Sequence, residues 1–186
     1  PVLLLGCLAF SAAFYGVYAF LADHVRALLA LSAGQVGFIA FAYGSGFLLA
    51  GVTGAPLIER AGPRRALPLA LGVIAMVYLG LLPAAHSLAA VLAVAVLWGA
   101  ASQLSLNLLV LLLSRARPEE RGAVLGLNTC TTYLGSSLGT AIAGTIYTHA
   151  GFEALGLAAA TALACAAAGL HWRLNRGRAA RGRAAA

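Results

Sequence analysis

The arginines of this chain are confined to a few places that are separated by long apolar runs. Eleven of the twelve lie in the stretch 59–65, in the stretch 115–121 or in the tail after Trp172. Each apolar interval is long enough for two crossings of a bilayer, so every arginine cluster returns to the same side. In membrane proteins the arginine-rich side is the cytoplasmic one. The pattern predicts a six-helix membrane domain with both ends in the cytoplasm, in the plasma or inner membrane.

The composition excludes a soluble domain. Hydrophobic residues make up 62% of the chain and charged residues only 9%, whereas a soluble domain has about 25% charged residues. So few charges could not cover the surface of a water-soluble protein of this length. The net charge of +7 does not indicate nucleic-acid binding, because the chain has no lysine and its arginines follow the ends of apolar segments.

Six segments reach the length of about 20 mostly apolar residues that a crossing helix needs. None of them shows the alternation of a membrane strand, so the fold class is predicted to be all-α and polytopic. The transmembrane domain covers residues 1–172, with crossings at about 2–22, 35–58, 66–82, 88–113, 123–147 and 154–172. The remaining residues, 173–186, are predicted to form a basic, disordered cytoplasmic tail that is attracted to anionic lipid.

Chemistry-bearing residues do not gather in any catalytic or metal-binding pattern. The three cysteines lie inside apolar runs without metal-like spacing. Ser45 stands between two glycines, as in some intramembrane proteases, but the histidines fall near the ends of segments rather than at its depth. We therefore expect no enzyme activity, no metal site and no cofactor.

The segment 54–65, which reads GAPLIERAGPRR, lies between the second and third predicted crossings. It resembles the signature loop of the major facilitator superfamily, which reads roughly G-x-x-x-D-R-x-G-R-[RK] at this place. Glu59 stands at the position of the aspartate, Ala55 at that of the leading glycine and Pro63 at that of the first basic residue. The matching positions and the adjacent basic residue are Arg60, Gly62, Arg64 and Arg65.

A second resemblance covers residues 121–139, which are similar to the fifth helix of the second half in drug-exporter and sugar-exporter branches of that family. The antiporter motif of first halves would need proline at Thr140 and glycine at Ala143. The resemblance therefore implies a C-terminal half, built from two inverted three-helix repeats, of a twelve-helix alternating-access transporter. It implies export of a drug-like or small organic solute. A six-helix scaffold or accessory protein without transport activity is the alternative.

The resemblance also implies roles for particular residues. In the family the first and fourth helices line the central cavity, and the second and fifth flank it. The substrate-cavity candidates on these helices are Tyr15, Tyr18, Gln103, Asn107, Asn128 and Thr132. For the amides Gln103, Asn107 and Asn128, contact between helices is an open alternative to contact with cargo, since a side-chain amide in lipid would cost several kcal/mol. The signature-loop residues Glu59, Arg60, Gly62, Arg64 and Arg65 are expected to act as a conformational latch.

The resemblance suggests several partners besides the small-molecule substrate. They are an N-terminal six-helix half, or a second copy of this chain, and anionic lipids at the cytoplasmic face. All five carboxylates lie outside the middle of the predicted crossings, where coupling residues of transporters usually lie. Proton coupling through the other half and uncoupled facilitation therefore both stay open.

Overall fold

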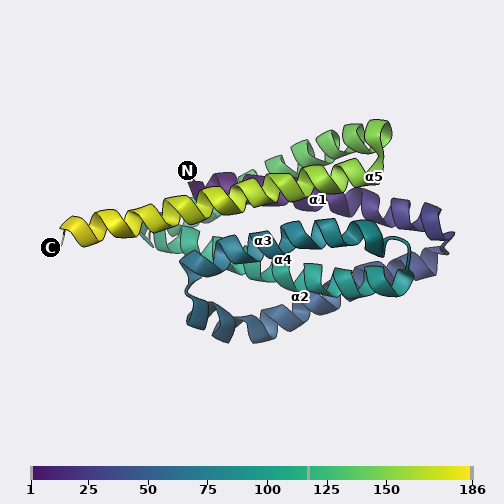
Figure 1. Ribbon diagram of the computed structural model, residues 1–186. Helices are drawn as coiled ribbons and strands as arrows, with labels where there is room; N and C mark the ends of the chain where they lie inside the picture. Colours follow the sequence, from purple (N-terminus) through teal and green to yellow (C-terminus); the bar gives the residue numbers. More distant parts are fainter. Residues whose placement is uncertain (1, 117, 185–186) are drawn as a thin grey trace.

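The computed structural model describes residues 2–116 and 118–184, and over these residues the chain is helical with short turns (Figure 1). Five of the helices are long and apolar enough to cross a membrane, which agrees with the predicted all-α membrane fold. The elements are α1 (Val2–Leu29), α2 (Ala33–Ala61), α3 (Pro63–Ala84), α4 (Leu88–Ala116), the 3₁₀ turn η1 (Pro118–Glu120) and α5 (Arg121–Ala184).

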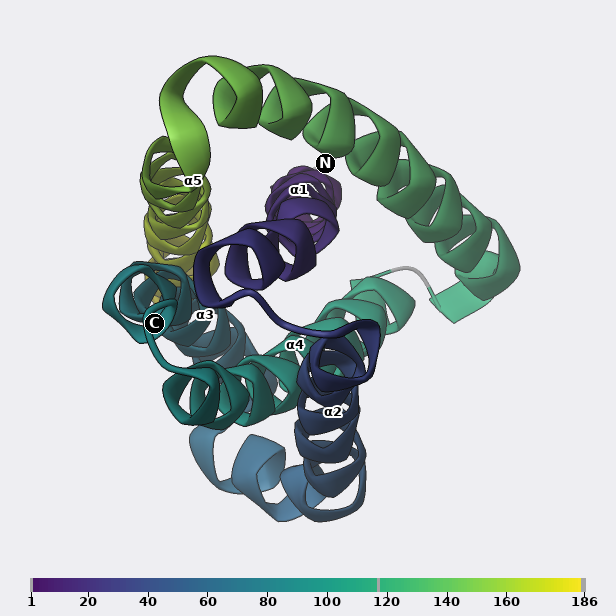
Figure 2. The ribbon, with the colours of Figure 1, turned by 90° about the vertical axis from the view of Figure 1, so that its right-hand side faces the viewer.

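Gly151 divides α5 into two arms. Its backbone angles, φ 79° and ψ 179°, are not helical, and a positive φ of this size suits glycine because it has no Cβ. The first arm covers residues 121–150 and the second covers residues 152–184. Figure 2 shows the chain reversing its direction between them. The fifth and sixth crossings predicted from the sequence lie one on each arm.

The second arm continues further than the sequence predicts. Residues 173–184 are helical and extend α5 to Ala184, where the sequence predicts a disordered tail; residues 185–186 lie outside the described part. Alanine and arginine have high helix propensities, and the preceding membrane helix supplies the nucleus that an isolated tail would lack. The glycines in this segment have low helix propensity, which is why its sequence predicts disorder.

The connection between α1 and α2 contains an N-terminal capping box. The Ser32 hydroxyl accepts a hydrogen bond from the backbone N–H of Gln35 (3.3 Å), and the Gln35 side chain accepts one from the backbone N–H of Ser32 (2.9 Å). Such reciprocal bonds satisfy two donors that a helix start otherwise leaves open. The helix therefore begins at Ala33, two residues before the predicted start.

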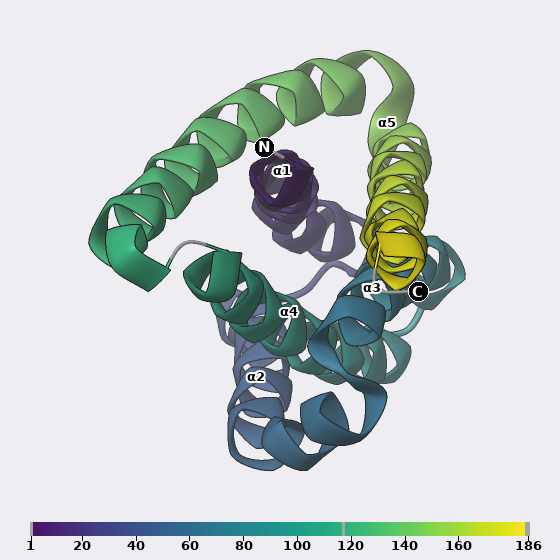
Figure 3. The same ribbon diagram turned by 90° about the vertical axis from the view of Figure 1, so that its left-hand side faces the viewer.

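The helices pack in two pairs, α1 with α5 and α2 with α4, and α3 connects the pairs. α1 packs mainly against α5, and α2 packs mainly against α4, while α3 contacts both α4 and α5. The end-on views of Figures 2 and 3 show α1 lying between the two arms of α5. α3 begins at Pro63, so Pro68 lies inside this helix rather than at its start.

Glycines bring these helices into close contact. A β-carbon on Gly46 of α2 would overlap the backbone of Val96 of α4, and one on Gly99 of α4 would overlap the backbone of Tyr43 of α2. Close approach of this kind is how membrane helices associate where lipid supplies no hydrophobic drive. Gly46 and Gly99 therefore allow the backbones of α2 and α4 to approach closely.

Candidate functional site

The predicted signature loop is a sharp turn at a single residue, Gly62. Its φ of 76° lies in the left-handed region that favours glycine. The Gly62 N–H donates to the carbonyl of Ile58 (2.9 Å) and ends α2, while the Gly62 carbonyl accepts from the N–H groups of Arg65 (3.1 Å) and Ala66 (3.0 Å) and starts α3. Pro63 occupies the first helical position, where its missing N–H costs least. Gly62 thus has a geometric reason to be glycine.

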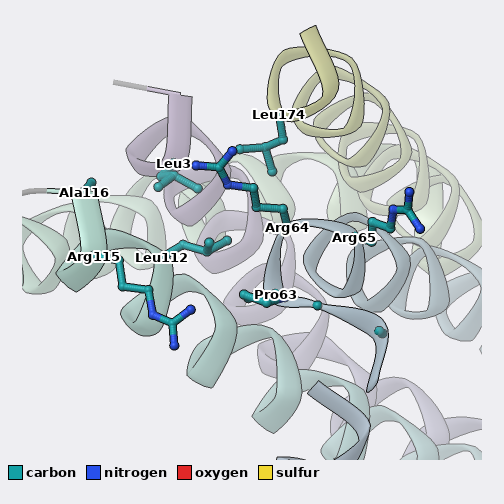
Figure 4. A pocket seen from close by; sticks show the side chains of 10 residues that line it. Leu3, Pro63, Arg64, Arg65, Leu112, Arg115, Ala116 and Leu174 are labelled. Atoms are coloured by element: carbon teal, nitrogen blue, oxygen red, sulfur yellow. The ribbon is translucent and has the colours of Figure 1, made fainter. Parts of the chain in front are cut away.

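The structure separates the five signature-loop residues into two sets. Gly62, Arg64 and Arg65 line a cavity of about 380 Å³ together with Arg115 from the end of α4. The other lining residues are mostly apolar, and Figure 4 shows Arg64 reaching toward Leu3 and Leu174. We call this site the arginine cavity; it is lined by Leu3, Ala61, Gly62, Pro63, Arg64, Arg65, Leu112, Arg115, Ala116 and Leu174.

Glu59 and Arg60 make up the second set. Both lie in the last turn of α2, and both side chains are exposed. Neither is among the described residues that line the arginine cavity. Their charges are therefore available at the surface of this helix end, where a contact with another protein segment could form.

Of the two aromatic candidates on α1, Tyr18 lies beside rings from two other helices. Tyr15 and Tyr18 are 39% and 41% exposed, whereas Ser11, which the helical spacing places near them, is buried at 1%. The difference arises because Ser11 faces Gly135 on the first arm of α5. Tyr18 instead lies 5.8 Å from the ring of Tyr43 of α2 and 5.9 Å from that of Trp98 of α4, measured between centroids.

Tyr18, Tyr43 and Trp98 also line a cavity of about 280 Å³ between α1, α2 and α4, which we call the aromatic cavity. The rings of Tyr43 and Trp98 meet edge to face at 5.4 Å, a favoured arrangement of aromatic pairs. Small residues such as Gly37 and Ala95 leave room beside the rings. The sequence does not indicate this cavity, because Tyr43 follows Tyr18 by about 25 positions and Trp98 follows Tyr43 by about 55. Trp98 is buried at 1%.

Several buried polar atoms beside this cavity lack a hydrogen-bond partner among the described residues. They include the Tyr78 hydroxyl, Trp98 Nε1 and the Ser102 hydroxyl. Leaving such a group unsatisfied costs about 1–3 kcal/mol. Bound water commonly satisfies groups of this kind, so this region is more polar than its apolar lining implies.

The two amides of α4 lie in different surroundings. Gln103 is half-buried, and a β-carbon placed on Gly51 of α2 would lie 3.4 Å from Gln103 Nε2. Asn107, one turn further along, is exposed. The structure therefore brings Gln103 against α2 and leaves Asn107 uncovered, although both were predicted to line the same cavity.

Asn128 and Thr132 lie where the first arm of α5 meets α1. The Thr132 hydroxyl donates to the backbone carbonyl of Asn128 (2.9 Å) and lies 3.4 Å from Cys7 Sγ. The Oδ1 atom of Asn128 is buried without a partner in the described part of the chain. These two candidates therefore take part in helix packing in this conformation.

Ser45 and two of the histidines make local contacts within the helices or with a neighbouring ring. Ser45 donates its hydroxyl proton to the carbonyl of Ala42 (2.8 Å). At the opposite end of the bundle from the arginine cavity, the His24 ring stacks on Phe152 at 4.4 Å, and His149 Nδ1 lies 2.9 Å from the carbonyl of Thr145. Among the described residues no group of three metal-ligating side chains comes together.

Known proteins similar to this chain point to one family. The family model described as Major Facilitator Superfamily matches residues 3–186. A protein of Bacillus subtilis (strain 168), described as the uncharacterized MFS-type transporter YwfA, is 32% identical over 144 residues. These residues are 77% of this chain and 35% of the relative, so the chain spans about a third of that protein's length. No solved structure matches the chain significantly.

Proposed function

Because the chain belongs to the major facilitator superfamily, we propose that it is the C-terminal six-helix half of a secondary transporter that exports a small, drug-like organic solute. The family is one of transporters rather than enzymes, in line with the sequence prediction. The chain is a multi-pass membrane protein. The name of the Bacillus relative, an MFS-type transporter, supports the transport activity that we assign to the whole protein.

Six crossings are supported by the two arms of α5 that flank Gly151. With the second arm counted separately, α1–α3 form one three-helix repeat, and α4 with the two arms forms the other. The second half of the transporter is another part of a longer chain or a second copy of this one. The departures from the first-half antiporter motif at Thr140 and Ala143 favour the C-terminal half.

The aromatic cavity is the observation that carries the proposed cargo class. Cavities for drug-sized ligands measure about 300–1,000 Å³, so its 280 Å³ would hold one flat portion of an organic molecule. Aromatic rings supply large contact areas for such a portion. The partly exposed Tyr15 and the exposed Asn107 would face the rest of the molecule, in a cavity that the second half completes.

Glu59 and Arg60 are proposed to act as a latch between access states. A charged contact that exists in one state and not in the other shifts the equilibrium toward the first state. Both side chains are exposed at the end of α2, so each can reach a partner on the second half. Arg64 and Arg65, which are expected to share this role, are exposed as well and also line the arginine cavity.

The arginine distribution supports a plasma- or inner-membrane location with both termini in the cytoplasm. The basic residues at this face would attract anionic lipid. The carboxylates lie near helix ends, so a proton-coupling group would come from the second half, and facilitated diffusion is the other possibility.

The test is transport of a fluorescent aromatic dye by the full-length protein in proteoliposomes. Tyr18→Leu removes an aromatic contact of about 0.5–1.5 kcal/mol, so the dye concentration for half-maximal transport should rise about two- to tenfold. Tyr133→Leu is the matched control, because Tyr133 is 69% exposed on α5 and lies outside the aromatic cavity. Equal effects of the two variants would contradict the cargo site. Absence of flux for a broad set of solutes would favour the scaffold alternative.

A further inference from the structure

The arginine cavity joins cationic and apolar surfaces in one place. Arg64 and Arg65 come from the start of α3 and Arg115 from the end of α4, and the described lining residues include no carboxylate. Leu3, Leu112 and Leu174 provide apolar walls from three further positions along the chain. In Figure 4 the Arg64 side chain extends between Leu3 and Leu174, while the Arg115 and Arg65 side chains point away from it.

The start of α3 adds to the positive charge at this cavity. The positive end of a helix macrodipole is stabilised by anions in the first turn, but the first turn of α3 contains no acidic residue and carries Arg64 and Arg65 instead. The N-cap residue, Gly62, has no side chain that could accept a hydrogen bond from the helix start. An anion in the cavity would therefore relieve repulsion between two guanidinium groups and the helix end.

Carboxylates nearby belong to other surfaces. Glu120 lines a neighbouring cavity of about 510 Å³ that shares Leu3 and Ala116 with the arginine cavity. Glu59 lies on the exposed end of α2. In the described part of the chain, the lining of the arginine cavity itself is cationic and apolar.

The geometry points to a binding site for the phosphate group of an anionic phospholipid. Guanidinium groups bind phosphate oxygens through paired, charge-assisted hydrogen bonds. Free phosphate offers the same oxygens, but it has no apolar part that could contact Leu3, Leu112 and Leu174. A phospholipid matches both parts, with its phosphate at Arg64, toward which the exposed Arg115 side chain can turn, and with its glycerol and first acyl carbons against the leucines. This assignment concerns the membrane and is independent of the cargo.

The experiment uses the full-length protein in nanodiscs and measures its preference for fluorescent phosphatidylglycerol over phosphatidylcholine by energy transfer from the tryptophans. Variants Arg64→Gln and Arg115→Gln should each weaken binding of phosphatidylglycerol about fivefold, the change expected for one basic residue near an anionic surface. The matched control is Arg121→Gln, which removes the same charge from an exposed residue outside the described lining. It should leave the preference unchanged. The charge-retaining variants Arg64→Lys and Arg115→Lys, together with circular dichroism, separate loss of binding from loss of folding.

Competition with inorganic phosphate identifies the source of the anion. Displacement of the fluorescent lipid by millimolar phosphate in the unmodified protein would overturn the lipid assignment in favour of a free anion. An equal loss in Arg121→Gln would overturn the site in favour of general surface charge. A protein without preference for phosphatidylglycerol would also overturn it, and would indicate that an acidic protein segment occupies the cavity. Dye transport is measured in parallel, so failure of this inference and failure of the proposed transport are distinguishable.

Discussion

Gly139 on the first arm of α5 lies so close to Ala12 of α1 that a β-carbon at position 139 would overlap the Ala12 backbone. One turn earlier, a β-carbon on Gly135 would lie 2.9 Å from the carbonyl oxygen of Leu8. The Gly135–Gly139 pair therefore forms the closest part of the contact between α1 and α5. Two glycines four positions apart on a membrane helix indicate close helix packing, and the structure shows that the partner helix is α1.

We expect Gly139→Ala to destabilise the protein by about 1–3 kcal/mol, because the added methyl group forces two backbones apart. Gly126→Ala is the matched control, since a β-carbon there meets no atom within 4 Å. Alanine is a better helix former than glycine by about 1 kcal/mol, so this control should be neutral or stabilising. Thermal unfolding in detergent checks both variants. A Gly139→Ala variant as stable as the control would show that the α1–α5 contact is looser than described.

The two amides of α4 are expected to respond differently to replacement by alanine. Gln103 lies against Gly51 of α2, so its loss should lower stability by about 0.6 kcal/mol, the average for polar contacts within membrane bundles. Asn107 is exposed, and loss of one hydrogen bond to cargo, worth about 1 kcal/mol, should raise the apparent binding constant about fivefold. Competition binding and thermal unfolding of each variant separate the two effects. Unchanged affinity in Asn107→Ala would remove Asn107 from the proposed cargo site.

The double variant Glu59→Ala, Arg60→Ala should lower transport more than it lowers expression. The physical reason is the loss of a charged contact that favours one access state. Transport rate per molecule of inserted protein is the measurement. Arg121→Ala is the control for removal of an exposed charge from the same face. Normal transport by the double variant would end the latch hypothesis.

The topology prediction places Arg60 and Arg117 in the cytoplasm and His86 and His149 outside; Arg117 lies outside the described residues. Single cysteines at these four positions, in a background without Cys7, Cys130 and Cys165, should react differently with a membrane-impermeant thiol reagent. Cysteines that replace the histidines should be labelled in intact cells, and those that replace the arginines only after permeabilisation. The reverse pattern would invert the orientation.

The sequence by itself determined that this is a helical membrane protein. It also determined roughly where the helices lie along the chain and that the arginines gather near their ends. Long apolar runs can satisfy their backbone groups in lipid only as helices, so composition and spacing were enough to predict the membrane helices. The major facilitator superfamily was named from the resemblance of residues 54–65 to its signature loop, and the family match confirms it. Helix ends were less certain, because capping by Ser32 and the extension of α5 to Ala184 depend on local hydrogen bonds and on the preceding helix.

Only the tertiary structure decided which faces meet. Helical spacing places Ser11 near Tyr15 and Gln103 near Asn107, but it cannot tell which member of each pair a neighbouring helix covers. The rings of Tyr18 and Trp98 share a cavity only because α1 and α4 pack with α2. Arg64 and Arg115 likewise line one cavity although they are about fifty positions apart. Side-chain periodicity specifies a face of one helix, whereas a site between helices depends on how several helices pack against one another.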